Sequence, residues 1–149
     1  MMTIEELLTY FDNGGLIGDD FEIVSSMRSF IQENRHLLER SIELYKRIRH
    51  LLFEGDYYRL NDPFTESICS WMIVSSDRKE FCLYTGRAQS APNPSLRLIF
   101  PRGLDPSAEY TDLNSGGQYR GDELMYYGLK VEYGACDGAT IFWHMKCLD

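Results

Sequence analysis

The chain has 149 residues, of which 44% are hydrophobic and 26% charged, and its formal net charge is −8. This length fits one domain, or a domain with a small appendage. Because phosphate groups are bound by Lys and Arg, so acidic a chain excludes nucleic acid and anionic membranes as expected partners. No apolar run is long enough to span a membrane and the N-terminus has no signal-peptide pattern, so we expect a cytoplasmic protein.

The first 55 residues have a helical pattern. A capping box at Thr3 and Glu6 predicts a short helix to about residue 11, and a second such signature predicts a helical stretch from about residue 21 to 30. The strongest predicted helix runs to about Phe53, and Gly55 stops it. Its apolar residues recur every three or four positions, which predicts one buried face composed of Leu38, Ile42, Tyr45, Ile48 and Leu52.

After Gly55 the apolar period changes to two, and turn residues separate the runs. Roughly six to eight short strands at this spacing predict an antiparallel β-sandwich with hairpin or Greek-key links. The expected fold class is therefore α+β, with a helical segment over residues 1–55 and a sandwich over residues 56–149. Trp71 and Trp143 occupy alternating apolar positions, so we expect both indoles to be mostly buried.

The cysteines and histidines do not predict a metal site, a cofactor site or a nucleophile. The cysteines have no C-x-x-C spacing, which favours buried free thiols at Cys69, Cys82, Cys136 and Cys147. His36 and His50 lie 14 positions apart on the predicted helix, about four turns, which is too far for joint chemistry. We interpret both as surface histidines. His144, in the last predicted strand, is interpreted as a satisfied or exposed sheet histidine rather than a catalytic base.

Glycines and aromatic residues suggest two further kinds of site. Gly116-Gly117 with Gly121 could cradle a phosphate, but no helical pattern follows them, so we expect a turn. Trp71, Trp143 and the pair Tyr126-Tyr127 could stack on sugar rings. At period-two spacing, packing in the core is favoured, and sugar stacking stays open as the alternative.

Several motifs follow one another in order between Leu44 and Leu129. They read Leu-Tyr-Lys-Arg-Ile-Arg-His, Gly-Asp-Tyr-Tyr-Arg-Leu, Pro-Asn-Pro-Ser-Leu-Arg and Gly-Asp-Glu-Leu-Met-Tyr-Tyr-Gly-Leu. This order resembles the C-terminal region of bacterial α-galactosidases of glycoside hydrolase family 36, and the resemblance extends from about Gly15 to the C-terminus. It implies that the helix carrying Tyr45 is the last helix of a barrel. It also implies that the segment from Gly121 to Leu124 is a strand of the C-terminal sandwich.

The family resemblance implies an activity but assigns no catalytic residue to this chain. The resemblance implies a design of three domains, as in family 36 enzymes: a β-supersandwich, a (β/α)8 barrel and a C-terminal sandwich that packs on the barrel. They hydrolyse α-galactosides such as melibiose and raffinose with two barrel aspartates, one of them in a Lys-x-Asp motif. No Lys in this chain is followed two residues later by Asp. A barrel needs about 250 residues, so we expect at most its final strand and helix here.

The leading hypothesis is a non-catalytic C-terminal accessory module that lacks the catalytic barrel, with a glycosidase catalytic domain as its partner. The alternatives are a sugar-binding or assembly module that acts with a separate glycosidase chain, and an independent enzyme. Catalytic, cofactor-binding and metal-ligating residues are all predicted to be absent. The long helix has a second apolar set, formed by Leu37, Leu44 and Leu51. This set predicts self-association through the N-terminal helices, most simply as a two-fold dimer.

Overall fold

The computed structural model describes residues 6, 9, 29–88, 97–133 and 137–148. Its contacts divide the chain into two compact units, Met1–Ile48 and Arg49–Asp149. The two helices predicted over residues 3–11 and 21–30 lie almost entirely outside the described residues, and the domain boundary predicted after residue 55 stays a prediction.

Helix α3 (Arg35–Glu54) forms where the long helix was predicted, but it buries a different set of residues. Ile48 is buried as expected, whereas Tyr45 and Leu52 of the predicted stripe are exposed. Leu51, from the second apolar set, is only 1% exposed. The predicted buried face is therefore partly wrong, because contact with the sheet at the end of the helix decides which residues are covered there.

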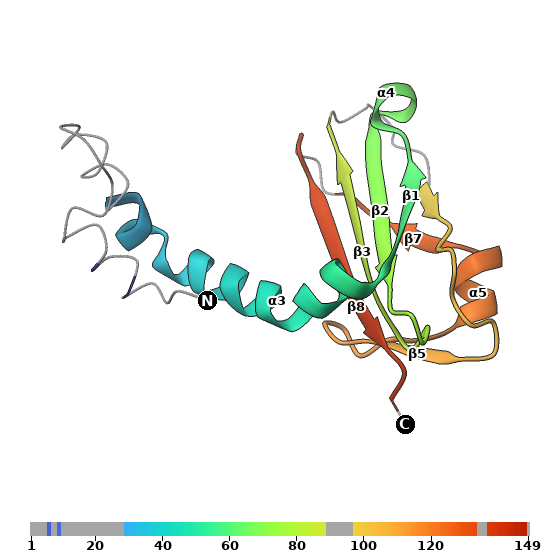
Figure 1. Cartoon of the computed structure of the whole chain (residues 1–149). Helices are drawn as coiled ribbons and strands as arrows, with labels where there is room; N and C mark the ends of the chain where they lie inside the picture. The colour runs from blue at the N-terminus through green and yellow to red at the C-terminus, as the bar shows by residue number, and fades with distance from the viewer. Residues whose placement is uncertain (1–5, 7–8, 10–28, 89–96, 134–136, 149) are drawn as a thin grey trace. The chain divides into compact units, whose positions relative to one another are not determined.

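The second unit is built on a six-stranded sheet with the order β1-β2-β3-β8-β5-β6, and a separate two-stranded ladder pairs β4 with β7. Figure 1 shows β1, β2, β3 and β8 side by side. Every pair is antiparallel, as predicted. The strands are β1 (Asp56–Asn61), β2 (Ile68–Val74), β3 (Glu80–Arg87), β4 (Arg97–Ile99), β5 (Glu109–Asp112), β6 (Gln118–Arg120), β7 (Leu129–Val131) and β8 (Thr140–Lys146).

The main core fills the space between the large sheet and a second layer made of β4, β7 and helix α5 (Gly121–Tyr126). In Figure 1 this layer lies on one side of the sheet and the end of α3 on the other. Phe81 and Tyr110 are both 0% exposed, and their rings meet edge to face with centroids 5.3 Å apart. Two layers around one apolar core confirm the predicted α+β sandwich. The residues of this core include Met72, Val74, Phe81, Leu83, Ile99, Leu104, Tyr110, Leu124, Leu129, Val131 and Met145.

Two short helices correct the prediction that only strands follow Gly55. Helix α4 (Pro63–Glu66) begins with the Asp62 carboxylate accepting the Phe64 amide at 3.0 Å. Helix α5 occupies the segment predicted as a strand, with two acidic residues in its first turn, which suits the positive end of the helix dipole. Tyr126 and Tyr127 therefore stand at a helix end, 76% and 77% exposed, and the expectation that they pack in a strand core was wrong.

The two tryptophans lie on opposite faces of the large sheet, and each is partly buried. Trp143 packs against the main core, as predicted. Trp71 instead packs against a small second cluster on the other face, formed by Leu51, Ile73 and Cys82. The alternating pattern did not predict which face of the sheet each indole occupies, because apolar residues occupy both faces of β2 and β3.

Candidate functional site

On the face of the sheet opposite the main core, a group of polar side chains lies next to the end of helix α3. Leu51 packs there on Ile73 and Cys82. Gly55 lets the chain at the end of the helix pass close to β2. A Cβ at this position would lie 2.5 Å from the Ile73 side chain and 2.6 Å from the Leu51 carbonyl oxygen. The last turn of the helix is therefore seated directly on the sheet.

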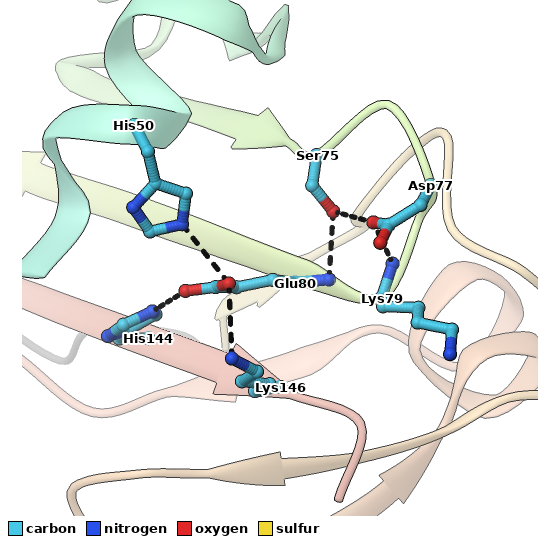
Figure 2. Close-up of polar contacts among 7 residues, drawn as sticks. All are labelled: His50, Ser75, Asp77, Lys79, Glu80, His144 and Lys146. Carbon is cyan, nitrogen blue, oxygen red and sulfur yellow. Dashed lines mark hydrogen bonds and ion pairs between the residues drawn. The ribbon is translucent and has the colours of Figure 1, made fainter. Parts of the chain in front are cut away.

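Glu80, the first residue of β3, lies at the centre of this site (Figure 2). Its Oε1 accepts a hydrogen bond from His144 Nε2 at 2.7 Å, and its Oε2 accepts one from His50 Nε2 at 3.1 Å. Lys146 Nζ lies 3.6 Å from Oε2. The Glu80 side chain is 13% exposed and that of His144 is 1% exposed, so the carboxylate meets its partners largely out of water. We call Glu80, His50, His144 and Lys146 the Glu80 cluster.

The β2–β3 turn positions Glu80 by a chain of short polar contacts. Ser75 Oγ donates to Asp77 Oδ1 at 2.6 Å and accepts the Glu80 amide at 3.0 Å. The Lys79 amide also donates to Asp77 Oδ1, at 3.0 Å. These hydrogen bonds keep the pKa of the Asp77 carboxyl below its ordinary value. Side chains of the turn thus bond its own backbone, and these bonds fix the position at which β3 begins with Glu80.

The electrostatics of the cluster keep Glu80 ionised at neutral pH. Burial alone would raise the pKa of the Glu80 carboxyl, but hydrogen bonds from His144 and His50, with the nearby positive charge of Lys146, hold it below its ordinary value. An ionised carboxylate can only accept hydrogen bonds. Both imidazoles therefore donate through Nε2, whether they are neutral or protonated.

The Glu80 cluster is not arranged for hydrolysis. A general acid needs a raised pKa, and a retaining glycosidase needs a second carboxylate about 5 Å from the first, with a free nucleophilic oxygen. Glu80 has a lowered pKa, and both of its oxygens are already engaged. In residues 29–88, 97–133 and 137–148, no His, Cys, Asp and Glu side chains gather as metal ligands. The arrangement suits an ion-paired contact between a helix and a sheet.

A cleft of about 410 Å³ borders the Glu80 cluster, and its walls come from the end of α3, the β2–β3 turn and the end of β8. Its lining contains both acidic and basic side chains, so the cleft has no strong preference for one sign of charge. The side chains that contribute charge are His50, Glu54, Asp77, Lys79, Glu80 and Lys146.

The structure places the histidines and cysteines of the sequence analysis as follows. His36 is exposed on α3, as predicted, and His144 is a buried sheet histidine whose Nε2 donates to Glu80. His50 is on the surface, as predicted, but it also contacts Glu80, which sequence reasoning missed. Cys82 is a buried free thiol whose pKa is raised by burial to about 11, which leaves it unreactive. Cys69 and Cys147 are free but only partly buried, and Cys136 lies outside the described residues.

The glycine pair forms a turn, as predicted. The Gly116 amide donates to the Asp112 carbonyl at 2.8 Å, and Gly116 has a φ of +76°, which favours glycine. The expectation that no helix follows these glycines was wrong, because a helix begins at Gly121. That helix, α5, has only six residues.

An aromatic row crosses β1, β2 and β3 on the same face as the Glu80 cluster. Trp71 stacks on Tyr84 with ring centroids 5.3 Å apart and ring planes at 22°. The ring centroid of Tyr57 lies 6.4 Å from that of Trp71, with the rings tilted at 30°. Since β1 and β3 flank β2, these two tyrosines stand on opposite sides of the indole. Sugar stacking needs a free aromatic face, and the stacked ring of Tyr84 occupies one face of Trp71.

Comparison with known proteins gives consistent matches over this region. Residues 68–145 match the family model described as the glycosyl hydrolase family 36 C-terminal domain. The α-galactosidase AgaA of Geobacillus stearothermophilus is 32% identical over 117 residues, which are 78% of this chain and 16% of AgaA. The bifunctional α-galactosidase/sucrose kinase AgaSK of Mediterraneibacter gnavus is 36% identical over 66% of this chain and 11% of AgaSK.

Solved structures agree with these sequence matches. The crystal structure of AgaA superposes with a TM-score of 0.74 at 32% identity, over 78% of this chain and 16% of that one. The galactosidase domain of AgaSK superposes with a TM-score of 0.70 at 29% identity, over 91% of this chain and 17% of that one. The chain thus spans a small part of the relatives that it matches. Within the described residues, no helix has the length and apolarity to cross a membrane.

Proposed function

The chain belongs to the glycosyl hydrolase family 36 C-terminal domains, and from this premise we propose that it is a non-catalytic accessory module of an α-galactosidase. The observation that carries the proposal is the match of residues 68–145 to the family 36 C-terminal domain, together with the superposition of the chain on 16% of AgaA. In this role the module completes the fold of a glycosidase catalytic domain and contributes no group that reacts with the α-galactoside. The catalytic domain is its proposed partner.

The chemistry of the chain supports a non-catalytic role. No Lys stands two residues before an Asp anywhere in the sequence. Glu80 of the polar face is ionised, and both of its oxygens are held by His50, His144 and Lys146, so it is not poised to react. Doubly substituted variants of AgaA have been solved in complex with raffinose and with stachyose, and α-galactosides of this class are the substrates that we propose for the enzyme to which this module belongs.

Two finer statements are also proposals. We propose a cytoplasmic location, in keeping with the acidic composition and the free thiols. We also propose self-association through the N-terminal helices, because Phe30 and Leu37 are 61% and 50% exposed. Light scattering on the purified chain tests this association, and a monodisperse monomer at high concentration would exclude it.

The second candidate function is a sugar-binding module, which the aromatic row favours because Tyr57 is 57% exposed. Calorimetric titration with galactose and with raffinose separates the two candidates. For the accessory module we expect no heat of binding at millimolar sugar, because the ring of Tyr84 is stacked on the indole of Trp71 and competes with a sugar for it. Saturable binding that Trp71→Ala abolishes and Tyr126→Ala leaves unchanged would instead favour the sugar-binding module.

A further inference from the structure

The sheet face opposite the main core extends well beyond the end of helix α3. The helix covers one end of this face, where Leu51 packs on Ile73 and Cys82. Successive side chains of a strand alternate between the two faces, so the register of β1, β2, β3 and β8 shows which residues share the face beyond that seat. We call them the aromatic face: Tyr57, Arg59, Cys69, Trp71, Tyr84, Gly86, Thr140 and Phe142.

Aromatic side chains stand where an open sheet would have polar ones. Trp71 of β2 pairs with Tyr84 of β3, and Tyr84 pairs with Phe142 of β8. All three are partly buried, and the neighbouring Tyr57 is 57% exposed. An antiparallel sheet that has one face in water normally carries polar side chains on that face. The aromatic face is therefore built to be covered by a second layer.

The charges of the aromatic face favour a protein as that layer. Arg59 is in register with Trp71 and is the one charged residue among those that define the face. It is exposed, and within the described part of the chain it has no ion pair. Protein interfaces are enriched in aromatic residues and Arg and depleted in Lys, Glu and Asp, and their binding energy comes mainly from Trp, Tyr and Arg.

A hollow at one end of the aromatic face gives room for an anchoring side chain. Its volume is about 260 Å³, and its lining includes Cys69, Tyr84, Gly86 and Thr140. A Cβ on Gly86 would lie 2.7 Å from the Tyr84 hydroxyl oxygen, so the missing side chain leaves space for the tyrosine ring. Residues that dominate a protein interface typically fill pockets of this kind.

We propose that the aromatic face is the surface on which the catalytic domain of the α-galactosidase docks, through an apolar patch with a carboxylate that pairs with Arg59. This inference rests on the proposed function and names the surface that the function uses. The place where α3 ends selects this occupant. The matched region is a C-terminal domain and covers 16% of AgaA, so most of such an enzyme precedes it.

The connection into the sandwich reaches the sheet on the same side as the aromatic face. Helix α3 ends at Glu54, β1 begins at Asp56, and Gly55 alone separates them. The last turns of the helix are seated on this face by Leu51. A domain that precedes the helix is therefore joined to the module on this side of the sheet, and such a tether raises its effective concentration at the aromatic face.

The test uses AgaA from which the matched C-terminal segment has been deleted, produced in the same cells as the complete, tagged chain. We expect the two to copurify, and hydroxyl-radical labelling of Tyr57 to fall about fivefold or more relative to the chain alone, because an interface core excludes water. Tyr126 and Tyr127, 76% and 77% exposed on the other layer, should change by less than about twofold.

Substitutions of exposed residues identify the docking surface without disturbing the core. Arg59→Glu and Tyr57→Ala should each lower the amount of copurified AgaA about tenfold or more, the size of a hot-spot loss. Arg102→Glu and Tyr126→Ala, also exposed, are matched controls on the other layer and should leave this amount unchanged. Intact AgaA should not copurify, because its own C-terminal domain fills the site.

The outcomes separate this inference from the proposed function. A complex that protects Tyr126 and Tyr127 but not Tyr57, or that Arg59→Glu and Tyr57→Ala leave intact, would overturn the docking surface and leave the accessory role standing. The absence of any complex would overturn both. Protection of Tyr57 in the chain alone as its concentration rises would assign the aromatic face to a second copy, and protection by raffinose would assign it to a sugar; either result overturns the proposal.

Discussion

Replacing Phe81 with alanine is expected to lower the free energy of unfolding by about 3–5 kcal/mol. Phe81 is 0% exposed in the middle of the main core, and its ring meets the Tyr110 ring at 5.3 Å. Truncation removes that contact and leaves a cavity between the two layers, which the surrounding strands cannot close. Urea denaturation followed by circular dichroism measures the loss.

Phe64 provides the matched control for this prediction. It is the same residue type, but 93% of it is exposed, on the short helix α4. Phe64→Ala should therefore change the free energy of unfolding by about 0.5 kcal/mol or less. If Phe81→Ala were no more harmful than Phe64→Ala, the core assigned to the space between the sheet and the β4–β7 layer would be wrong.

Substitution of Gly121 by alanine is the second large effect that we expect, with a loss of about 3 kcal/mol. A Cβ at this position would lie 1.9 Å from the carbonyl oxygen of Asp105 and 2.8 Å from its carbonyl carbon. Both atoms belong to the backbone, so no side-chain rotation relieves the clash. The Gly121 amide also donates to the Ala108 carbonyl at 2.9 Å, which prevents the start of α5 from moving away.

Gly117 is a suitable comparison for thermal unfolding of the Gly121 variant. Its added Cβ would first meet the hydroxyl oxygen of the Tyr119 side chain, at 3.0 Å, and the end of a side chain can shift. We expect Gly117→Ala to cost about 1 kcal/mol or less. Equal melting temperatures for the two variants would show that α5 does not start against residues 105–106.

The long helix and the strands could be predicted because each repeats its apolar period over enough residues. Helix α3 covers 20 residues, and β2, β3 and β8 cover seven or eight each. Helix α5 could not, because six residues contain less than two helical turns and show no clear period. Its conformation depends on the close backbone approach of Gly121 to Asp105, a contact that no local pattern reveals.

The Glu80 cluster lay beyond sequence reasoning for a different reason. His50 and His144 could each be described, but nothing local linked them to one carboxylate. Their meeting depends on the antiparallel register of β3 and β8, in which Glu80 faces Lys146, and on where α3 crosses the sheet. The available signal was weak: Glu80 and Lys146 are charged residues at the ends of otherwise apolar strands. Charged ends of this kind are common where strands meet solvent.

The claim that this chain contributes no reacting groups is tested most directly by hydrolysis of nitrophenyl α-galactoside by the purified chain, with a complete family 36 α-galactosidase as the positive control. We predict no release of nitrophenol above the buffer rate at any pH between 4 and 8, because both oxygens of Glu80 are engaged by histidines and its pKa is lowered rather than raised as a general acid requires. Turnover that stays with the protein through a second purification step, and that Glu80→Gln or another single carboxylate substitution abolishes, would contradict it.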